Sequence, residues 1–559
     1  MKKLVLISTL LFVPAFAQLT TDQKIADFRY LAGLYDKQYA PYEWKKTLFG
    51  FDLLNVDSWV DRVAKTTSDL DFYEVLVDYV ASLNDTHDSY VLPSDFVATM
   101  GLGADIYDGK VLIDGINRVL LPSSTYPFQI GDEIVSVDGK DAAQLLSDFA
   151  KYARQGNPRS TQRIAAARIV TRPQSRMPHA VDLGDSATVV IRRQSGDLET
   201  YTIPWTKTGT PLAVGPVPSP KAVRQAAGVP VTDDPVPDYM QAWLDVQYSA
   251  APDDFGLNGY GARTPIFALP AGFVQRLGTR PSDFFYSGTF TASGYKIGYI
   301  RIPNYGSLAA SVQQQFDDEI VYMQANTDGL VIDEMRNTGG FLCFGENIMT
   351  RLVPYKFQAI GYELRATRSR LNSFWSSMTS AQAQGADQWI VDIYTALYNE
   401  MLSAYQQNRG LTGPLPLCPI GLDRFPATDR NGNMIAYTKP IVMLIDEFST
   451  STADSVPAMF QDAQRGLLFG WRSNGAGGTN TNFFPVGDYS EGTTGMTLGL
   501  MNRPNAVTVE GYPTTTHIEN VGVQPDIAVD YMTRDNLLQR GKPFVDAFTA
   551  ATVNLIQGH

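Results

Sequence analysis

The stretch from Lys439 to Asp462, KPIVMLIDEFSTSTADSVPAMFQD, constrains the fold of this chain more than any other. Its continuous apolar run, Ile441 to Ile445, predicts a buried strand, and the later spacing of apolar residues predicts a helix. Hydroxyl groups cluster at the turn between them, beside N–H groups that a helix start leaves unpaired and that stabilise negative charge. Our hypothesis is that Ser451, in this turn, is a catalytic nucleophile.

The same hydroxyls have a simpler interpretation as helix caps. Ser451 is followed three residues later by Asp454, which is the spacing of a capping box. Serine and threonine are common caps in front of helices, so this stretch alone favours the cap. The rest of the chain has to decide between the two interpretations.

Length and composition indicate a large, acidic, globular protein. A chain of 559 residues is too long for one core and suggests about three domains. Hydrophobic residues make up 44% of the sequence and aromatic residues 11%, which is enough to bury substantial cores. The formal net charge is −13 and we find no basic cluster, so nucleic acid and anionic membrane surfaces are not expected as partners.

The first residues have the pattern of a signal peptide. Lys2 and Lys3 precede an apolar stretch, and Ala15-Phe16-Ala17 supplies the small residues of a cleavage site. No later apolar run is long enough to span a bilayer. We expect cleavage after Ala17 and an exported protein, either secreted or periplasmic.

No metal or cofactor is predicted. The two cysteines, Cys343 and Cys418, are not spaced as metal ligands, and whether they pair or remain free stays open. The His-Glu-x-x-His motif of metalloproteases is absent. The run Asp429-Arg430-Asn431-Gly432-Asn433 is interpreted as a hairpin turn and not as a calcium loop.

The periodicity of the sequence changes along the chain and divides it into segments. These are a signal peptide at 1–17, a helical domain at 18–97, a β-rich module at 98–206, a Pro- and Gly-rich linker or covering segment at 207–284, and an α/β domain at 285–559 with an insertion at about 354–438. In the last domain strands alternate with helices, which indicates an α/β sheet with function at the strand ends.

The β-rich module resembles a PDZ domain. The run GDEIVSVDGK, residues 131–140, predicts a strand pair of that fold. The resemblance implies that Gly101, Leu102 and Gly103 form its carboxylate-binding loop, where successive backbone N–H groups hold the C-terminus of a peptide.

A serine nucleophile needs a base, and histidine is scarce in this chain. Besides His559 at the end and His179 in a polar segment, only His87 and His517 occur. Without other information, the better prediction for His87 is a solvent-facing helix end. His517 and Glu519 are expected to share one face of a strand.

Lysine is the other base that such serines use. None occurs between Lys439 and Lys542. This excludes a Ser–Lys dyad in which the lysine follows the nucleophile closely.

Four motifs in a fixed order resemble the S41 peptidases. They are the PDZ-like module, DEMRNTGG at 333–340, FSTSTAD at 448–454 and IENVGVQPDI at 518–527. In the processing proteases of this family the middle serine of the second-to-last motif is the nucleophile, which corresponds to Ser451. Those enzymes also carry a catalytic lysine, and the matching position here is Ala476.

A chlamydial type of secreted S41 enzyme is more similar, because it uses serine, histidine and glutamate. By this resemblance the partners of Ser451 are His87 and Glu519. The resemblance also implies an α/β catalytic core of the ClpP/crotonase type, with an N-terminal helical domain and a PDZ-like β-rich module.

The resulting hypothesis is a secreted serine endopeptidase that acts on proteins or peptides. His87 would take the Ser451 proton while Glu519 holds the imidazole. No nucleic acid partner and no membrane span are expected, and a homo-oligomer is left open.

The oxyanion would be met by the backbone N–H groups of Thr452 and of Gly339 or Gly340, since glycine allows a close approach of the backbone. The Pro-rich segment 209–238 is a candidate restraint over the cleft.

The alternative is a catalytically inactive S41-like protein that binds peptides through the PDZ-like module. A secreted esterase of the α/β-hydrolase fold is disfavoured, because no serine of this chain lies in a Gly-x-Ser-x-Gly elbow.

Overall fold

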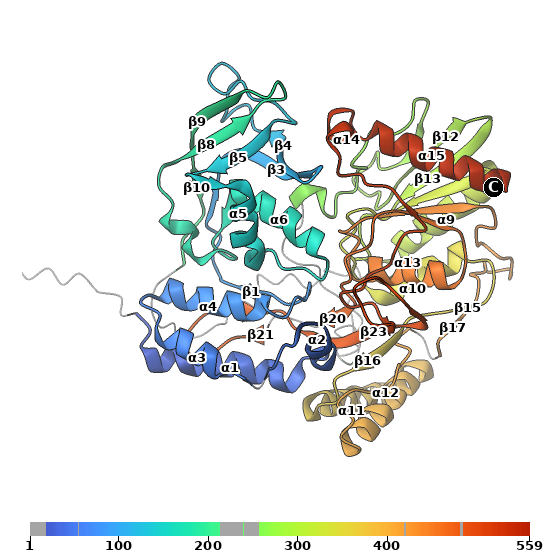
Figure 1. Cartoon of the computed structure of the whole chain (residues 1–559). Coiled ribbons are helices and arrows are strands. Elements are labelled where there is room, and N and C mark those ends of the chain that lie inside the picture. Colours follow the sequence, from blue (N-terminus) through green and yellow to red (C-terminus); the bar gives the residue numbers. More distant parts are fainter. Residues whose placement is uncertain are drawn as a thin grey trace, which may run out of the picture.

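The computed structural model describes residues 18–53, 55–212, 239, 257–418, 421–480 and 484–558. The predicted signal peptide and most of the predicted linker, with nearly all of segment 209–238, lie outside these residues. Figure 1 shows a helical part near the N-terminus, a β-rich module above it and a large α/β domain beside both. The predicted fold class is confirmed.

Four helices form within the segment that was predicted to be helical. They are α1 (Thr21–Gln38), α2 (Tyr42–Phe49), α3 (Asp57–Ala64) and α4 (Asp69–Ala81). Thr20 and Ser68 start α1 and α4 with capping boxes, in which side chains satisfy the first N–H groups of the helix.

The core of this helical part is completed by residues from near the other end of the chain. Strand β1 (Tyr90–Val91) pairs with β22 (Thr493–Thr494), which pairs with β21 (Phe484–Pro485). Val486, Met496 and Leu498 are buried in the same apolar cluster as the faces of α1 and α4. The helical part is therefore not a self-contained unit.

The β-rich module is built on an antiparallel sheet with the order β3-β4-β5-β8-β9. Its elements are β3 (Leu102–Tyr107), β4 (Lys110–Ile116), β5 (Glu133–Val137), β6 (Lys140–Asp141), α5 (Ala142–Phe149), η1 (Ala150–Tyr152), α6 (Pro158–Val170), η2 (Pro178–Asp182), β8 (Ser186–Arg192) and β9 (Leu198–Pro204). A small sheet of β10 (Thr206–Thr208), β2 (Val97–Thr99) and β7 (Thr171–Pro173) adjoins it.

A seven-stranded sheet forms the centre of the α/β domain. Its order is β11 (Val274–Leu277), β12 (Tyr286–Ala292), β13 (Tyr295–Arg301), β14 (Gly329–Asp333), β18 (Ile441–Ile445), β19 (Leu467–Gly470) and β25 (Ile527–Ala528). The pairings from β13 to β25 are parallel. The carboxyl ends of β14 and β18 therefore meet at one edge, where such sheets carry their sites.

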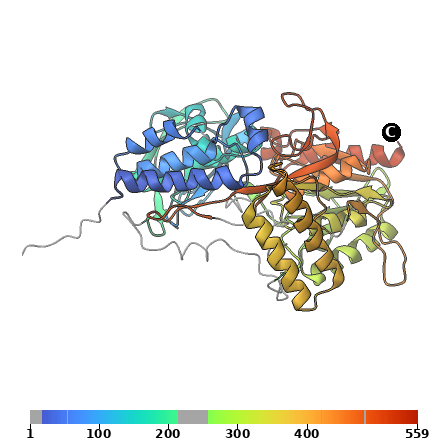
Figure 2. The ribbon, with the colours of Figure 1, turned by 90° about the horizontal axis from the view of Figure 1, so that it is seen from below.

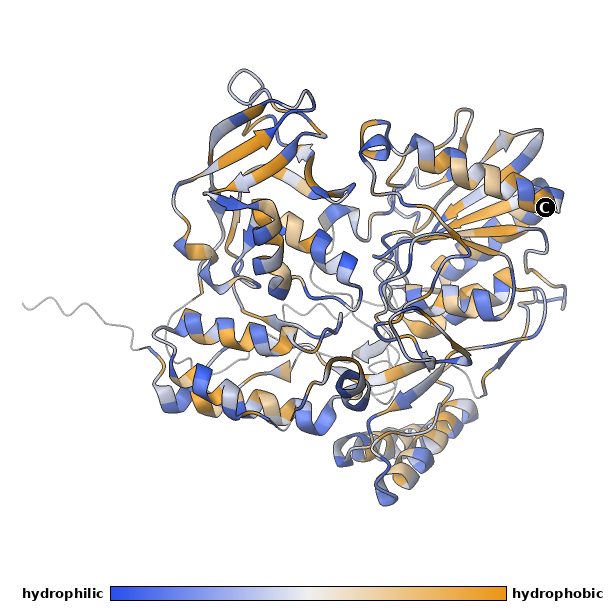
Figure 3. Ribbon diagram, in the orientation of Figure 1, coloured by the Kyte–Doolittle hydropathy of each residue, from blue (hydrophilic) through white to orange (hydrophobic). Residues whose placement is uncertain are grey.

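The two faces of this sheet are covered by different helices. Outside the insertion, the helices described in the domain are α9 (Ala310–Asn326), α10 (Leu342–Leu352), α13 (Thr452–Asp462), α14 (Arg534–Leu538) and α15 (Lys542–Gln557). Along β18, Ile441, Met443 and Ile445 pack with α9, α10 and α13, while Val442 and Leu444 pack with α15. This alternation is the period of a strand, and Figure 3 shows the sheet as the apolar centre of the domain.

The predicted insertion contains a helical hairpin that projects from the domain, as Figure 2 shows from below. It consists of α11 (Arg368–Ala383) and α12 (Gln388–Gln406). The remaining elements are η5 (Leu257–Gly259), β15 (Phe357–Gln358), β16 (Gly361–Leu364), β17 (Asp423–Arg424), β20 (Gly478–Asn480), β23 (Thr497–Val507) and β24 (Thr515–His517). In the described parts of the chain no helix has both the length and the apolar character needed to cross a membrane.

Candidate active site

The predicted strand-to-helix turn is present, and its serine has an unusual backbone. Ser451 is the N-cap of α13, with φ 63° and ψ −112°, and it is completely buried. Residues other than glycine rarely adopt positive φ, and such conformations cluster at functional sites. The turn follows the end of β18, at the centre of the sheet.

Hydrogen bonding distinguishes Ser451 from the other hydroxyls of the turn. Four of them donate to backbone carbonyls: Ser449 Oγ to Glu334 at 2.7 Å, Thr450 Oγ1 to Phe448 at 2.9 Å, Thr452 Oγ1 to Gly340 at 2.7 Å, and Ser455 Oγ to Thr452 at 2.9 Å. The Asp454 half of the predicted capping box is present, because Ser451 N donates to Asp454 Oδ2 at 2.7 Å, whereas Ser451 Oγ has no hydrogen-bond partner among the described residues. The cap interpretation therefore does not account for this hydroxyl.

Asp454 holds the turn in place. Its carboxylate accepts hydrogen bonds from Ser451 N at 2.7 Å, Ser473 Oγ at 2.5 Å, Gly475 N at 2.8 Å and Ala476 N at 3.0 Å. Burial raises the pKa of Asp454 to about 6, although these hydrogen bonds oppose the shift. Ala476, at the position of the family's lysine, thus supplies a backbone N–H to the nucleophile turn.

The predicted oxyanion donors lie against the nucleophile. Thr452 is the first residue of α13, and the N–H groups of the next three residues donate to the carbonyls of Thr450 and Ser451. Gly339 N–H donates to Asn337 Oδ1 at 2.8 Å and is occupied in this conformation. Of the two glycines, Gly340 is therefore the better candidate for an oxyanion donor.

Gly339 gives a sharp test of this packing. A Cβ at this position would lie 2.5 Å from Thr450 O and 2.7 Å from Ser451 Cβ, at a φ of +76°. We expect Gly339→Ala to lower kcat at least about 100-fold by displacing the nucleophile, with a loss of about 2 kcal/mol in stability. Steady-state kinetics on a peptide substrate and thermal unfolding measure the two effects.

Gly385 is the matched control for that substitution. It has a φ of +67°, and nothing lies within 4 Å of its added Cβ. Gly385→Ala should therefore cost stability and leave kcat unchanged. Equal kcat for Gly339→Ala and wild type would show that the contact with Ser451 does not matter.

The prediction of a solvent-facing His87 is wrong. Helix α4 ends at Ala81, and His87 lies in the following loop with only 3% of its surface exposed. Its backbone N–H donates to Asp85 Oδ1 at 2.9 Å, and the same oxygen is 4.0 Å from His87 Nδ1. Burial lowers the pKa of His87 to about 4, with Asp85 opposing the shift and Lys45 adding to it.

The strand prediction for Glu519 is also wrong. Strand β24 ends at His517, and Glu519 lies in the turn that follows, before Asn520 with a φ of 62°. Glu519 is completely buried, whereas His517 is half-buried and its Nε2 is 3.1 Å from Glu363 Oε2. The two side chains therefore do not act as one strand face.

Glu519 is held by a lysine that the sequence did not identify. Lys45 Nζ, from α2, donates to Glu519 Oε1 at 2.5 Å and to Asn520 Oδ1 at 2.7 Å. Burial and the neighbouring Asp85 raise the pKa of Glu519, and Lys45 lowers it. Nothing in the local sequence distinguishes Lys45 from its exposed neighbour Lys46, so no signal in the sequence could have found it.

The helical part, the β-rich module and the α/β domain meet between the His87 loop and the Ser451 turn. Thr86 Oγ1, next to His87, donates to Asn474 Oδ1 at 2.5 Å and accepts from Gly156 N of the β-rich module at 2.7 Å. Asn474 N in turn donates to Ser449 O at 2.9 Å, two residues before Ser451. These contacts link the His87 loop to the Ser451 turn through Asn474.

The predicted peptide-binding residues lie at the start of an edge strand. Leu102 and Gly103 pair with Ile116 and Gly115 of β4, and Gly101 N donates to Thr99 Oγ1 at 3.1 Å. Further along β3, Asp105 and Arg163 of α6 form a buried two-point ion pair with a closest distance of 2.7 Å.

Arg163 extends this pair to the α/β domain. Its Nη1 lies 3.1 Å from Glu447 Oε1, four residues before Ser451. The ion pair between β3 and α6 thus continues to Glu447 and docks the module beside the nucleophile turn.

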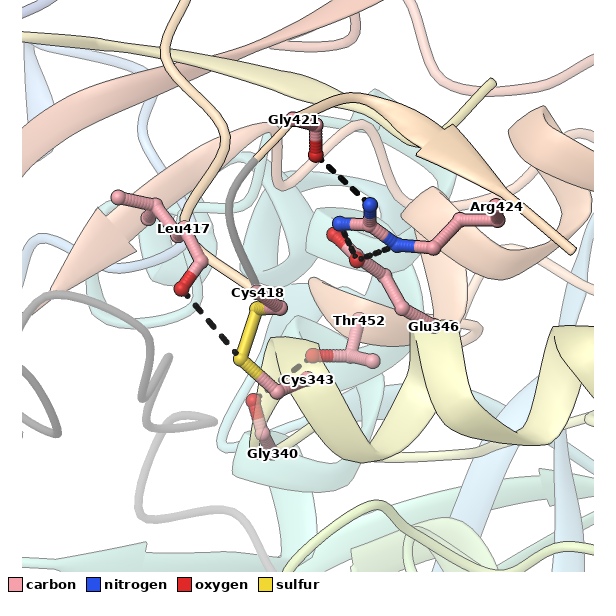
Figure 4. Close-up of a disulfide and its surroundings, with 8 residues drawn as sticks. All are labelled: Gly340, Cys343, Glu346, Leu417, Cys418, Gly421, Arg424 and Thr452. Carbon is pink, nitrogen blue, oxygen red and sulfur yellow. Dashed lines mark hydrogen bonds and ion pairs between the residues drawn. A yellow bond between two sulfur atoms is a disulfide. The ribbon is translucent and has the colours of Figure 1, made fainter. Parts of the chain in front are cut away.

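A disulfide ties the insertion to the helix that follows the glycine pair. Cys343 and Cys418, whose pairing the sequence left open, are bonded across 75 residues. Figure 4 shows Cys343 close to Gly340 and Thr452, with the buried ion pair of Glu346 and Arg424 on the same side. No group of three potential metal ligands occurs within the described ranges.

Comparisons with known proteins agree with this fold. The model of peptidase family S41 matches residues 296–529, and the model of a PDZ domain matches residues 97–212. A Chlamydia pneumoniae protein is 26% identical over 95% of this chain and 90% of its own length. The chloroplastic C-terminal processing peptidase of Tetradesmus obliquus is 26% identical over 43% of this chain and 36% of its own.

A solved structure described as mature CPAF complexed with lactacystin has the same fold. It superposes with a TM-score of 0.73 at 21% identity, and covers 96% of this chain and 99% of its own.

Proposed function

The chain is a serine peptidase of family S41, and we propose that it is an endopeptidase whose nucleophile is Ser451. The observation that carries this proposal is the state of the Ser451 hydroxyl. It is buried at a strained turn and makes no hydrogen bond among the described residues, whereas the four neighbouring hydroxyls all donate to backbone carbonyls. A hydroxyl without a structural role at the start of a central helix is suited to attack a carbonyl carbon.

His87 is the general base of the proposed reaction. With a pKa of about 4 its imidazole is neutral near pH 7, so it can accept the Ser451 proton and return it to the leaving amine. The tetrahedral oxyanion is met by the N–H groups of Thr452 and Gly340. Water then hydrolyses the acyl-enzyme through the same groups.

The acid that supports His87 differs from the expected arrangement. Glu519 accepts from Lys45 with one oxygen, and Asp85 is the carboxylate 4.0 Å from His87 Nδ1. We therefore assign Glu519 and Asp85 together to the stabilisation of the imidazolium that forms in the transition state.

The lowered pKa of His87 predicts an unusual pH profile. An imidazole with a pKa of about 4 is still neutral at pH 5, where an ordinary one, with a pKa of about 6.5, is mostly protonated. We expect the acid limb of kcat/KM to fall near pH 4, and a limb near pH 6.5 would contradict the buried, uncharged state. Stability should decline between about pH 6.5 and pH 4, because only the unfolded state takes up this proton.

A serine-reactive fluorophosphonate probe tests the proposed nucleophile. We expect one adduct on the folded protein, read by intact mass and located on Ser451 by peptide mapping. Ser451→Ala should give no adduct. A folded, fully processed wild-type protein that stays unlabelled would overturn the assignment and favour a peptide-binding protein.

We also propose that the protein is exported, with cleavage after Ala17. The support is the basic start, apolar stretch and Ala-Phe-Ala pattern of its first residues. N-terminal sequencing of protein recovered outside the cytoplasm should begin at Gln18, and an intact Met1 on that material would contradict the cleavage.

A further inference from the structure

Two consecutive residues of α2 contact Glu519, one at its backbone carbonyl and the other at its carboxylate. Trp44 Nε1 donates to the Glu519 carbonyl oxygen at 2.9 Å, and Lys45 Nζ donates to its carboxylate at 2.5 Å. Lys45 is completely buried, and Trp44 is 9% exposed. Helix α2 of the N-terminal part is therefore in direct contact with the predicted catalytic acid.

Lys45 is a fixed cation and not a second base. Its ammonium has three N–H donors and no acceptor. All three are used, by Asn84 O at 3.0 Å, Glu519 Oε1 at 2.5 Å and Asn520 Oδ1 at 2.7 Å. A neutral amine would have only two N–H groups for three acceptors.

Lys45 is also the cation of a buried acidic cluster. Asp85 Oδ2 lies 4.0 Å from Lys45 Nζ, and Asp88 and Glu519 are buried close by, coupled electrostatically to Lys45. Burial and Asp85 raise the pKa of Glu519, and the charge of Lys45 opposes that rise and so favours the ionised acid.

We propose that Lys45 is a positioning residue of this peptidase, whose ammonium orients Glu519 and Asn520 and keeps the acid cluster beside His87 in its working geometry. The proposal rests on the proposed function, in which Ser451, His87 and Glu519 carry the reaction. It assigns this role to the Lys45 ammonium itself and not to the docking of α2 as a whole.

Arg365 provides a control for a purely structural role of α2. This residue joins the same segment to the α/β domain through Tyr39 O at 3.0 Å, Ala40 O at 2.8 Å and Glu43 Oε2 at 2.6 Å. None of these contacts involves Glu519. Arg365→Met therefore weakens docking without removing the cation, and Lys46→Met changes an exposed lysine on the same helix.

The test compares Lys45→Met, Arg365→Met and Lys46→Met at a temperature where all are folded. We expect Lys45→Met to lower kcat about 100-fold with KM within threefold, the effect of misplacing a catalytic group. The rate of Ser451 labelling by the fluorophosphonate should fall in parallel. Both controls should keep kcat within threefold, and Arg365→Met should lower only the melting temperature.

A second comparison covers the case in which Lys45→Met does not fold. The pair Lys45→Met and Glu519→Gln removes the cation together with its hydrogen-bonded acid, so Glu519 is not left as an unpaired buried charge. We expect the pair to be no more than threefold slower than Glu519→Gln alone, because Lys45 acts through Glu519. A further 100-fold loss of kcat in the double variant would show that Lys45 does not act through Glu519.

Other outcomes also decide. Unchanged kcat in Lys45→Met, or an equal loss in Arg365→Met, would overturn the positioning role and leave the proposed function intact. A wild-type protein that is not labelled on Ser451 would instead refute the proposed function.

Discussion

Replacement of Ser451 by alanine is expected to lower kcat by about 10⁶-fold, the size of effect seen when a serine nucleophile is removed. The expected change in stability is small, within about 1 kcal/mol, because Ser451 Oγ makes no hydrogen bond that the substitution would break. Peptide hydrolysis under single-turnover conditions and thermal unfolding measure the two quantities.

Ser449 and Ser455 supply matched controls two and four residues away. Their hydroxyls donate to the Glu334 and Thr452 carbonyls, so their alanine variants should lose about 1 kcal/mol each and retain turnover. A Ser451→Ala protein that still hydrolyses the substrate at the wild-type rate, or a Ser455→Ala protein that is inactive yet folded, would contradict the assignment.

Replacement of His87 by alanine is the second large effect. Without a base, the Ser451 proton has no acceptor, and kcat should fall by about 10⁴-fold or more. His179, exposed to 40% and paired with Asp182 at 2.6 Å, is the control, and its alanine variant should be fully active. If His87→Ala kept its turnover and His179→Ala lost it, His87 would not be the general base.

The strand, the turn and the helix around Ser451 were predictable because they depend on local sequence. Apolar runs report burial and period, so the ends of β18 and α13 follow from the residues between Ile441 and Asp462. The S41 motifs then distinguished Ser451 from the neighbouring hydroxyls, and the hydrogen bonds of the turn separate them in the same way.

The surroundings of the proposed partners of Ser451 were not predictable. Periodicity in its own segment placed His87 at a solvent-facing helix end, because it carries no information about the loops that cover it. Glu519 was placed on a strand because alternation does not reveal a turn made by a left-handed Asn520. Lys45 was missed altogether, because its burial depends on contacts with residues more than 470 positions away.

The shared core of the helical part also has a consequence for how the chain folds. Tyr35 and Thr494 meet across 459 positions, and β1 gains its strand partner only from residues 493–494. Contacts of such high sequence separation form late, since the whole intervening loop must be closed first. A growing chain that has already made His87 and Lys45 therefore has neither Glu519 nor a finished helical core. Proteolytic competence should arise as one of the last events of folding, so that the nascent enzyme passes through synthesis as an inert polypeptide.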